Sequence, residues 1–178
     1  DRGGRRCAHK KTERDVHHVP ETASFMRWRY LPGRKQNHTW NTLGHLDKYY
    51  RTLKSFGAPV DIISEAKNLS DYPVVIAPAY QMADEALVNR WMEYVKQGGN
   101  LVLSCRTAQK DRFGRLPEIP FGAMINELTG NEMEFYDLLH PEEPGKIVMD
   151  GQTYTWSTWG EILKPGKESQ VWATYTDE

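Results

Sequence analysis

The chain has 178 residues, of which 39% are hydrophobic and 26% are charged, and its formal net charge at pH 7 is −1. This length and composition are typical of one globular domain with a single core. A net charge close to zero gives no reason to expect a nucleic acid or a membrane as a partner. No apolar run approaches the roughly 20 residues that cross a bilayer, and residues 1–7 contain no apolar segment of the kind found in signal peptides. We therefore expect a cytoplasmic protein, with a periplasmic parent as the alternative.

Residues 1–24 form a mixed-charge segment with little apolar content, which predicts a flexible leader. The histidines of this leader could form a metal-binding tract. Neighbouring histidines point in different directions in regular structure, however, so an exposed arm is the favoured interpretation. We predict no metal site and no cofactor.

Residues 25–178 are expected to form one α/β domain. At its start, Phe25–Tyr30 alternates apolar and basic residues, as a half-buried strand does. This run could be an edge strand or an aromatic arm that packs on another subunit. Aromatic residues are enriched in interface cores, so Trp28, Tyr30 and Trp40 are our candidate interface residues.

The segment between residues 44 and 106 alternates two amphipathic helices with three short apolar strands. Asn41 or Thr42 can cap the first helix, and apolar residues recur along it at helical spacing. Strands that are apolar on both faces must be covered by helices on both sides, which indicates a parallel sheet. The expected elements are helix His45–Phe56, strand Pro59–Ile63, strand Val74–Ala77, helix Asp84–Gln97 and strand Leu101–Ser104.

The remainder of the chain has a different pattern. Gln109–Pro120 is polar and is expected to be a surface loop, and Ala123–Thr129 a short helix. From Lys146 onwards the chain has antiparallel character, with Asp150–Gly151 as the strongest hairpin signal. The predicted fold is therefore a three-layer α/β sandwich with a mainly parallel central sheet and a small antiparallel C-terminal portion.

One candidate nucleophile is present in the central segment. Cys105 follows a predicted strand, where α/β glutaminases hold their catalytic thiol, and His140 and Glu142 form an H-x-E pair. A strained nucleophile turn needs small residues on both sides, whereas Leu103–Ser104 and Arg106–Thr107 flank this cysteine. We therefore interpret it as a buried, inert thiol.

Other catalytic patterns are weaker. Glu132, Glu134 and Asp137 are close in sequence, but nothing in the pattern places two carboxylates across a sugar-sized cleft. The chain contains no phosphate-binding loop, no dinucleotide glycine motif and no H-E-x-x-H. Trp156 and Trp159 could stack on a sugar, although tryptophans in a strand-rich tail more often pack within sheets.

Several segments taken together resemble the middle domain of family 42 glycoside hydrolases, the β-galactosidases. They span residues 40–53 (WNTLGHLDKYYRTL), 57–63 (GAPVDII), 74–79 (VVIAPA), 94–103 (YVKQGGNLVL), 106–107 (RT) and 132–139 (EMEFYDLL). The resemblance implies a fold like flavodoxin or the class I glutamine amidotransferases, without the amidotransferase catalytic residues. It also implies trimerisation and a contribution to the wall of a neighbouring subunit's active site.

In that family the catalytic glutamates belong to a separate (β/α)8 barrel of about 250 residues, which cannot fit within this chain. No catalytic residue is therefore carried over, and we expect the chain alone to be inactive. We predict a homotrimerisation domain of a β-galactosidase, which meets galactoside only through the parent enzyme, at Trp156, Trp159 and Arg106. The alternatives are an amidotransferase-like cysteine enzyme using Cys105 and a carbohydrate-binding module.

Overall fold

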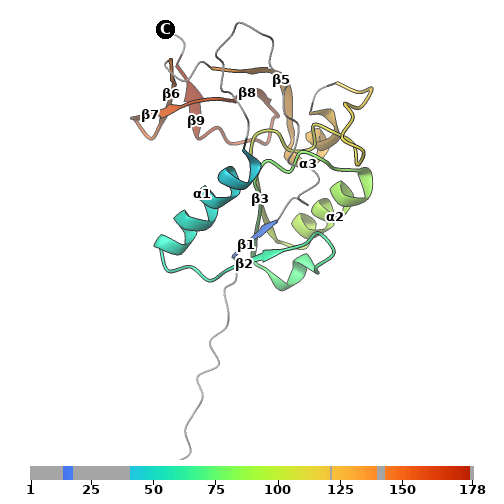
Figure 1. The fold of residues 1–178 in the computed structure, drawn as a ribbon. Helices are drawn as coiled ribbons and strands as arrows, with labels where there is room; N and C mark the ends of the chain where they lie inside the picture. Colours follow the sequence, from blue (N-terminus) through green and yellow to red (C-terminus); the bar gives the residue numbers. More distant parts are fainter. Residues whose placement is uncertain (1–13, 18–40, 121, 140–142, 177–178) are drawn as a thin grey trace, which may run out of the picture.

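The computed structural model describes residues 14–17, 41–120, 122–139 and 143–176. These residues form a four-stranded parallel sheet with helices beside it, and two small antiparallel sheets at one end (Figure 1). The α/β class is therefore confirmed. No helix in this described part is both long enough and apolar enough to cross a membrane.

All strand pairs of the four-stranded sheet are parallel, and the strand order is β2-β1-β3-β4. β1 (Arg14–His17) lies in the segment expected to be a flexible leader, yet it is an interior strand that pairs with both β2 and β3. Its Arg-Asp-Val-His sequence lacks the apolar run of a buried strand, which is why the sequence pattern did not indicate it. The other strands are β2 (Val60–Ile63), β3 (Val74–Ala77) and β4 (Asn100–Leu103).

Helices α1 (Thr42–Ser55) and α2 (Glu85–Lys96) lie on opposite sides of this sheet (Figure 1). The Asn41 side chain caps α1 by accepting a hydrogen bond from the backbone N–H of Gly44 at 2.9 Å, and Asp84 caps α2 in the same way. α1 packs against β1 and β2, whereas α2 packs against β4. A short 3-10 helix, η2 (Leu69–Asp71), joins β2 to β3.

The main core lies between α2 and the parallel sheet. Trp91 and Val75 are completely buried, and Leu87 is nearly so. The Trp91 ring meets the ring of Tyr80 edge to face, with 5.6 Å between centroids. A smaller cluster around Leu46 holds α1 on the other side of the sheet.

The C-terminal part is more strongly antiparallel than expected. The predicted hairpin is confirmed: β6 and β7 are joined by Asp150 and Gly151, whose φ angles of 52° and 74° suit a tight hairpin turn. β5 and β8 form a second antiparallel pair that we did not predict. Five of the nine strands in the described residues are thus antiparallel, so the mainly parallel sheet that we expected covers only half of the domain. The elements of this part are η3 (Ala123–Ile125), α3 (Asn126–Thr129), β5 (Asn131–Asp137), β6 (Gly145–Met149), β7 (Gln152–Trp156), β8 (Gly160–Pro165) and β9 (Ala173–Tyr175).

Candidate functional site

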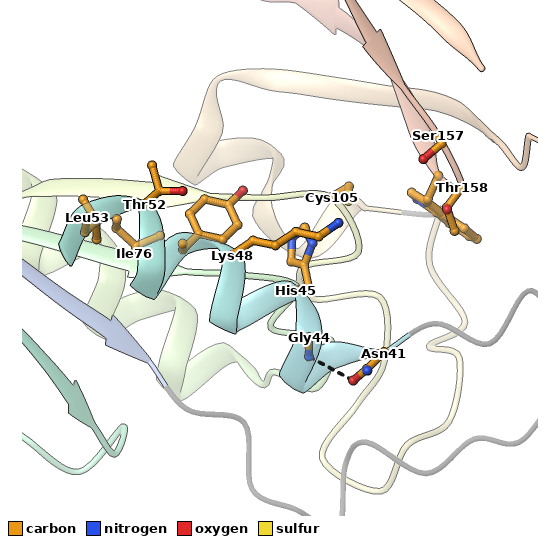
Figure 2. A pocket seen from close by; sticks show the side chains of 12 residues that line it. Asn41, Gly44, His45, Lys48, Thr52, Leu53, Ile76, Cys105, Ser157 and Thr158 are labelled. Carbon is orange, nitrogen blue, oxygen red and sulfur yellow. Dashed lines mark hydrogen bonds between the residues drawn. The ribbon is translucent and has the colours of Figure 1, made fainter. Parts of the chain in front are cut away.

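A pocket of about 660 Å³ lies between α1 and the loop that joins β7 to β8 (Figure 2). The side chains of His45 and Lys48 reach from α1 towards Cys105, and Ser157 and Thr158 border the far end. The pocket therefore forms where the N-terminal half of α1 meets the carboxyl end of β4. Its remaining lining residues are Asn41, Gly44, Tyr49, Thr52, Leu53, Ile76 and Trp159.

Ser104 joins α1 to the ends of two strands at this pocket. Its hydroxyl lies 3.0 Å from Nε2 of His45 and accepts a hydrogen bond of 2.7 Å from the backbone N–H of Ala79. Burial lowers the pKa of His45, and the nearby charge of Lys48 lowers it further. Both effects favour the neutral imidazole.

Cys105 lies in the same pocket but is not activated. Burial raises the pKa of its thiol to about 12, and the negative charge of Glu161 acts in the same direction. A catalytic cysteine needs the opposite shift, because the thiolate is the nucleophile. His140 and Glu142, the predicted partners of this thiol, lie outside the described residues, as does Cys7.

Two residues beside the pocket have a left-handed backbone although neither is a glycine. Arg106 follows Cys105 with a φ of 67°, and the β-branched Thr158 has a φ of 80°. Such conformations are held only by the surrounding structure and cluster at functional sites. The guanidinium of Arg106 lies over the indole of Trp159.

Trp159 is covered by two planar groups. The guanidinium carbon of Arg106 lies 4.4 Å from the indole centroid, and the Tyr136 ring is stacked at 4.4 Å with an interplanar angle of 9°. Two planar groups cannot both stack at this distance on the same face of one ring, so they cover opposite faces.

A single carboxylate oxygen holds this cluster together. Oε1 of Glu161 accepts hydrogen bonds from the backbone N–H of Arg106 at 2.7 Å, from Nε2 of Gln109 at 2.9 Å and from Nε1 of Trp159 at 3.0 Å. These donors come from the loop after β4 and from the segment before β8, so this glutamate connects the two halves of the fold. Our sequence reasoning missed Glu161, since a lone acid in a short strand carries no local signal.

The three predicted substrate-side residues are not brought together. Arg106 and Trp159 are in contact, whereas Trp156 packs directly over Gly145 and Gly160 and meets the Tyr175 ring edge to face at 5.3 Å. The predicted interface residues Trp28, Tyr30 and Trp40 lie outside the described residues. Within the described ranges, no group of three or more His, Cys, Asp or Glu side chains could hold a metal ion.

Comparison with known proteins identifies relatives of this domain. The family model described as the β-galactosidase trimerisation domain matches residues 25–178. β-Galactosidase BgaH of Haloferax lucentense is 33% identical over 126 residues, which cover 71% of this chain and 19% of that protein. β-Galactosidase LacZ of Lactobacillus acidophilus is 26% identical over 94% of this chain and 25% of its own length. The chain thus spans about a fifth to a quarter of these relatives.

Solved structures agree on the fold. The β-galactosidase of Bacillus circulans sp. alkalophilus superposes with a TM-score of 0.80 at 21% identity, over 94% of this chain and 25% of that one. The cold-adapted β-galactosidase of Rahnella sp. R3 gives a TM-score of 0.80 at 20% identity, over 95% of this chain and 25% of that one.

Proposed function

The chain belongs to the β-galactosidase trimerisation domain family, and from this membership we propose that it joins three copies of a β-galactosidase subunit into a homotrimer without breaking bonds itself. The observation that carries the proposal is the match of the family model from residue 25 to residue 178. The proposed parent enzyme hydrolyses terminal β-galactosides at catalytic groups outside this chain.

The chemistry of the strand-end pocket supports a non-catalytic role. Burial raises the pKa of the Cys105 thiol and lowers the pKa of the His45 imidazole, so both shifts disfavour a thiolate–imidazolium ion pair. An amidotransferase-like enzyme needs a thiolate at this position. No observation therefore favours the cysteine-enzyme alternative.

The proposal includes a flavodoxin-like fold for the parallel part of the domain, related to that of the class I glutamine amidotransferases. The order β2-β1-β3-β4, with all pairs parallel, matches the first four strands of the flavodoxin order 2-1-3-4-5. Helices on opposite faces of the sheet support the same assignment (Figure 1). In such sheets, ligand sites form at the carboxyl ends of the strands, where Cys105 and Arg106 lie.

Of the three predicted residues Trp156, Trp159 and Arg106, we propose galactoside contact in the assembled enzyme for Trp159 and Arg106, which touch each other, whereas Trp156 packs against Gly145 and Gly160. The covered faces of Trp159 favour contact through its edge and through the guanidinium of Arg106 over face-to-face stacking. A carbohydrate-binding module would need an open aromatic face that binds galactose in the isolated chain. Titration of the isolated chain with galactose, followed by tryptophan fluorescence, therefore distinguishes such a module from a trimerisation domain. Unchanged tryptophan fluorescence supports the trimerisation role, and a saturable change indicates a binding module.

Light scattering after size exclusion, combined with a galactosidase assay, tests the main proposal. We expect a particle of about 62 kDa, three times the 20.6 kDa of one chain, and no hydrolysis of a chromogenic galactoside. A monomer at every accessible concentration contradicts the proposal. Hydrolysis that survives repurification would contradict the non-catalytic role.

A further inference from the structure

The loop after β4 holds a pair of apolar side chains in solvent. Phe113 is 82% exposed and Leu116 is 70% exposed. The turn is closed by Asp111, whose Oδ1 accepts hydrogen bonds of 2.8 Å from the backbone N–H groups of Phe113 and Arg115. The backbone N–H of Asp111 donates in turn to the carbonyl of Arg115 at 2.9 Å. We call residues 110–116 the Phe113 loop; its turn is fixed by its own hydrogen bonds.

The base of the Phe113 loop is attached to the core. The Arg112 guanidinium forms ion pairs of 2.7 Å with both Glu65 and Asp84, and Asp84 is the N-cap of α2. The hydroxyl of Tyr80 donates a hydrogen bond of 2.6 Å to the same Glu65. The loop therefore presents its aromatic tip on a rigid support, so little further ordering is needed when the tip is buried. Exposed, preorganised aromatic side chains of this kind are typical interface anchors.

A second exposed apolar surface lies between the two antiparallel sheets. It is a groove of about 1250 Å³ lined by residues of β5 to β9 and of the segment between β8 and β9. Its most exposed apolar side chains are Trp172 at 75%, Phe135 at 58%, Val171 and Leu163. Exposed apolar side chains gathered in one concave site are typical of an interaction site.

The charges of these two surfaces are opposite in sign. The groove lining contains Asp137, Glu143 and Glu161 against Lys146, which is a net charge of −2. In the Phe113 loop Arg112 is already ion-paired with Glu65 and Asp84 at its base, so the remaining charges are Lys110 and Arg115 against Asp111, which is a net charge of +1. Complementary potentials favour this pairing and disfavour loop-to-loop or groove-to-groove contact.

A closed trimer requires two different surfaces on each copy. In a three-fold ring every contact is heterologous, so one patch of each subunit meets another patch of the next. The Phe113 loop is convex and basic, and the groove is concave and acidic. Resting on the trimerisation proposed above, we propose that Phe113 and Leu116 of one copy insert into the groove of the next copy, and that three such contacts close the ring. The occupant of the groove is thus a second copy of this chain.

Sedimentation velocity over a range of concentrations tests this contact with three variants. The loop variant is Phe113→Ser with Leu116→Ser, and the groove variant is Leu163→Ser with Trp172→Ser. Phe56→Ser is the matched control, because Phe56 is 79% exposed at the end of α1 and belongs to neither surface. Circular dichroism and thermal melting verify that each variant folds.

We expect the natural chain and the control to form trimers, and the loop and groove variants to associate at least about 30-fold more weakly, as loss of an interface anchor does. Mixing the loop variant with the groove variant should give a 1:1 dimer, because the intact loop of the groove variant can enter the intact groove of the loop variant. The other two surfaces of that dimer are both defective, so no third copy can add. Trimers that persist in both variants overturn this interface and leave the proposed function intact. A natural chain that remains monomeric overturns both.

Discussion

Replacing Glu161 by alanine should loosen the connection between the parallel sheet and the antiparallel end. The change removes one oxygen that accepts three hydrogen bonds of 2.7 to 3.0 Å. A hydrogen bond to a charged group contributes about 1.5–3 kcal/mol, and three that share one acceptor are not additive. Gln109 is buried, so its donor would have no access to water. We therefore expect Glu161→Ala to lower the free energy of unfolding by about 3–5 kcal/mol.

Urea unfolding followed by circular dichroism, at one protein concentration, measures this loss. Glu161→Gln keeps an accepting oxygen without the charge and should lose only about 1–2 kcal/mol. Glu134→Gln is the matched control, because it removes an exposed charge from the neighbouring strand β5. A Glu161→Ala protein within about 0.5 kcal/mol of the natural chain would refute the assigned role, since that is the spread of ordinary surface substitutions.

Three further predictions follow from the contacts described above. In a Cys7→Ser background, Cys105 should react slowly with thiol reagents at pH 8 until urea unfolds the chain, because burial raises the pKa of its thiol from 9.0 to about 12. The stability that this raised pKa contributes should be present below pH 9 and lost as the pH rises towards 12. Asp84→Ala removes both the α2 cap and the ion pair with Arg112, and it should lower the free energy of unfolding by about 1–2 kcal/mol. Asp84→Asn keeps only the capping oxygen and should recover part of this loss in the same urea assay, so an Asn variant no more stable than the Ala variant would contradict the cap. Gly160→Ala should lower the free energy of unfolding by about 1–3 kcal/mol and change the near-UV circular dichroism, because the added methyl group would overlap the Trp156 ring. An unchanged spectrum and melting curve would contradict this tight packing of the Trp156 ring.

Local patterns alone determined the elements whose signals lie within a few neighbouring residues. Val74–Ala77 was predicted with the observed bounds, and α2 begins and ends within one residue of its prediction. The hairpin at Asp150–Gly151 was equally clear. Helix periodicity, caps and tight turns depend on short-range sterics and hydrogen bonds, so they can be read without knowledge of the rest of the chain. The family resemblance came from the same segments.

Tertiary structure alone decided what depends on partners distant in sequence. β1 is a strand because β2 and β3 offer it hydrogen bonds on both sides, although its own four residues are mostly polar. β5 and β8 stabilise each other across more than twenty intervening residues. Glu161 acts as a connector only because the fold brings three N–H donors, two of them more than fifty residues away, to a single oxygen. Such pairings arise when the chain closes on itself, and a window along the sequence does not contain both partners.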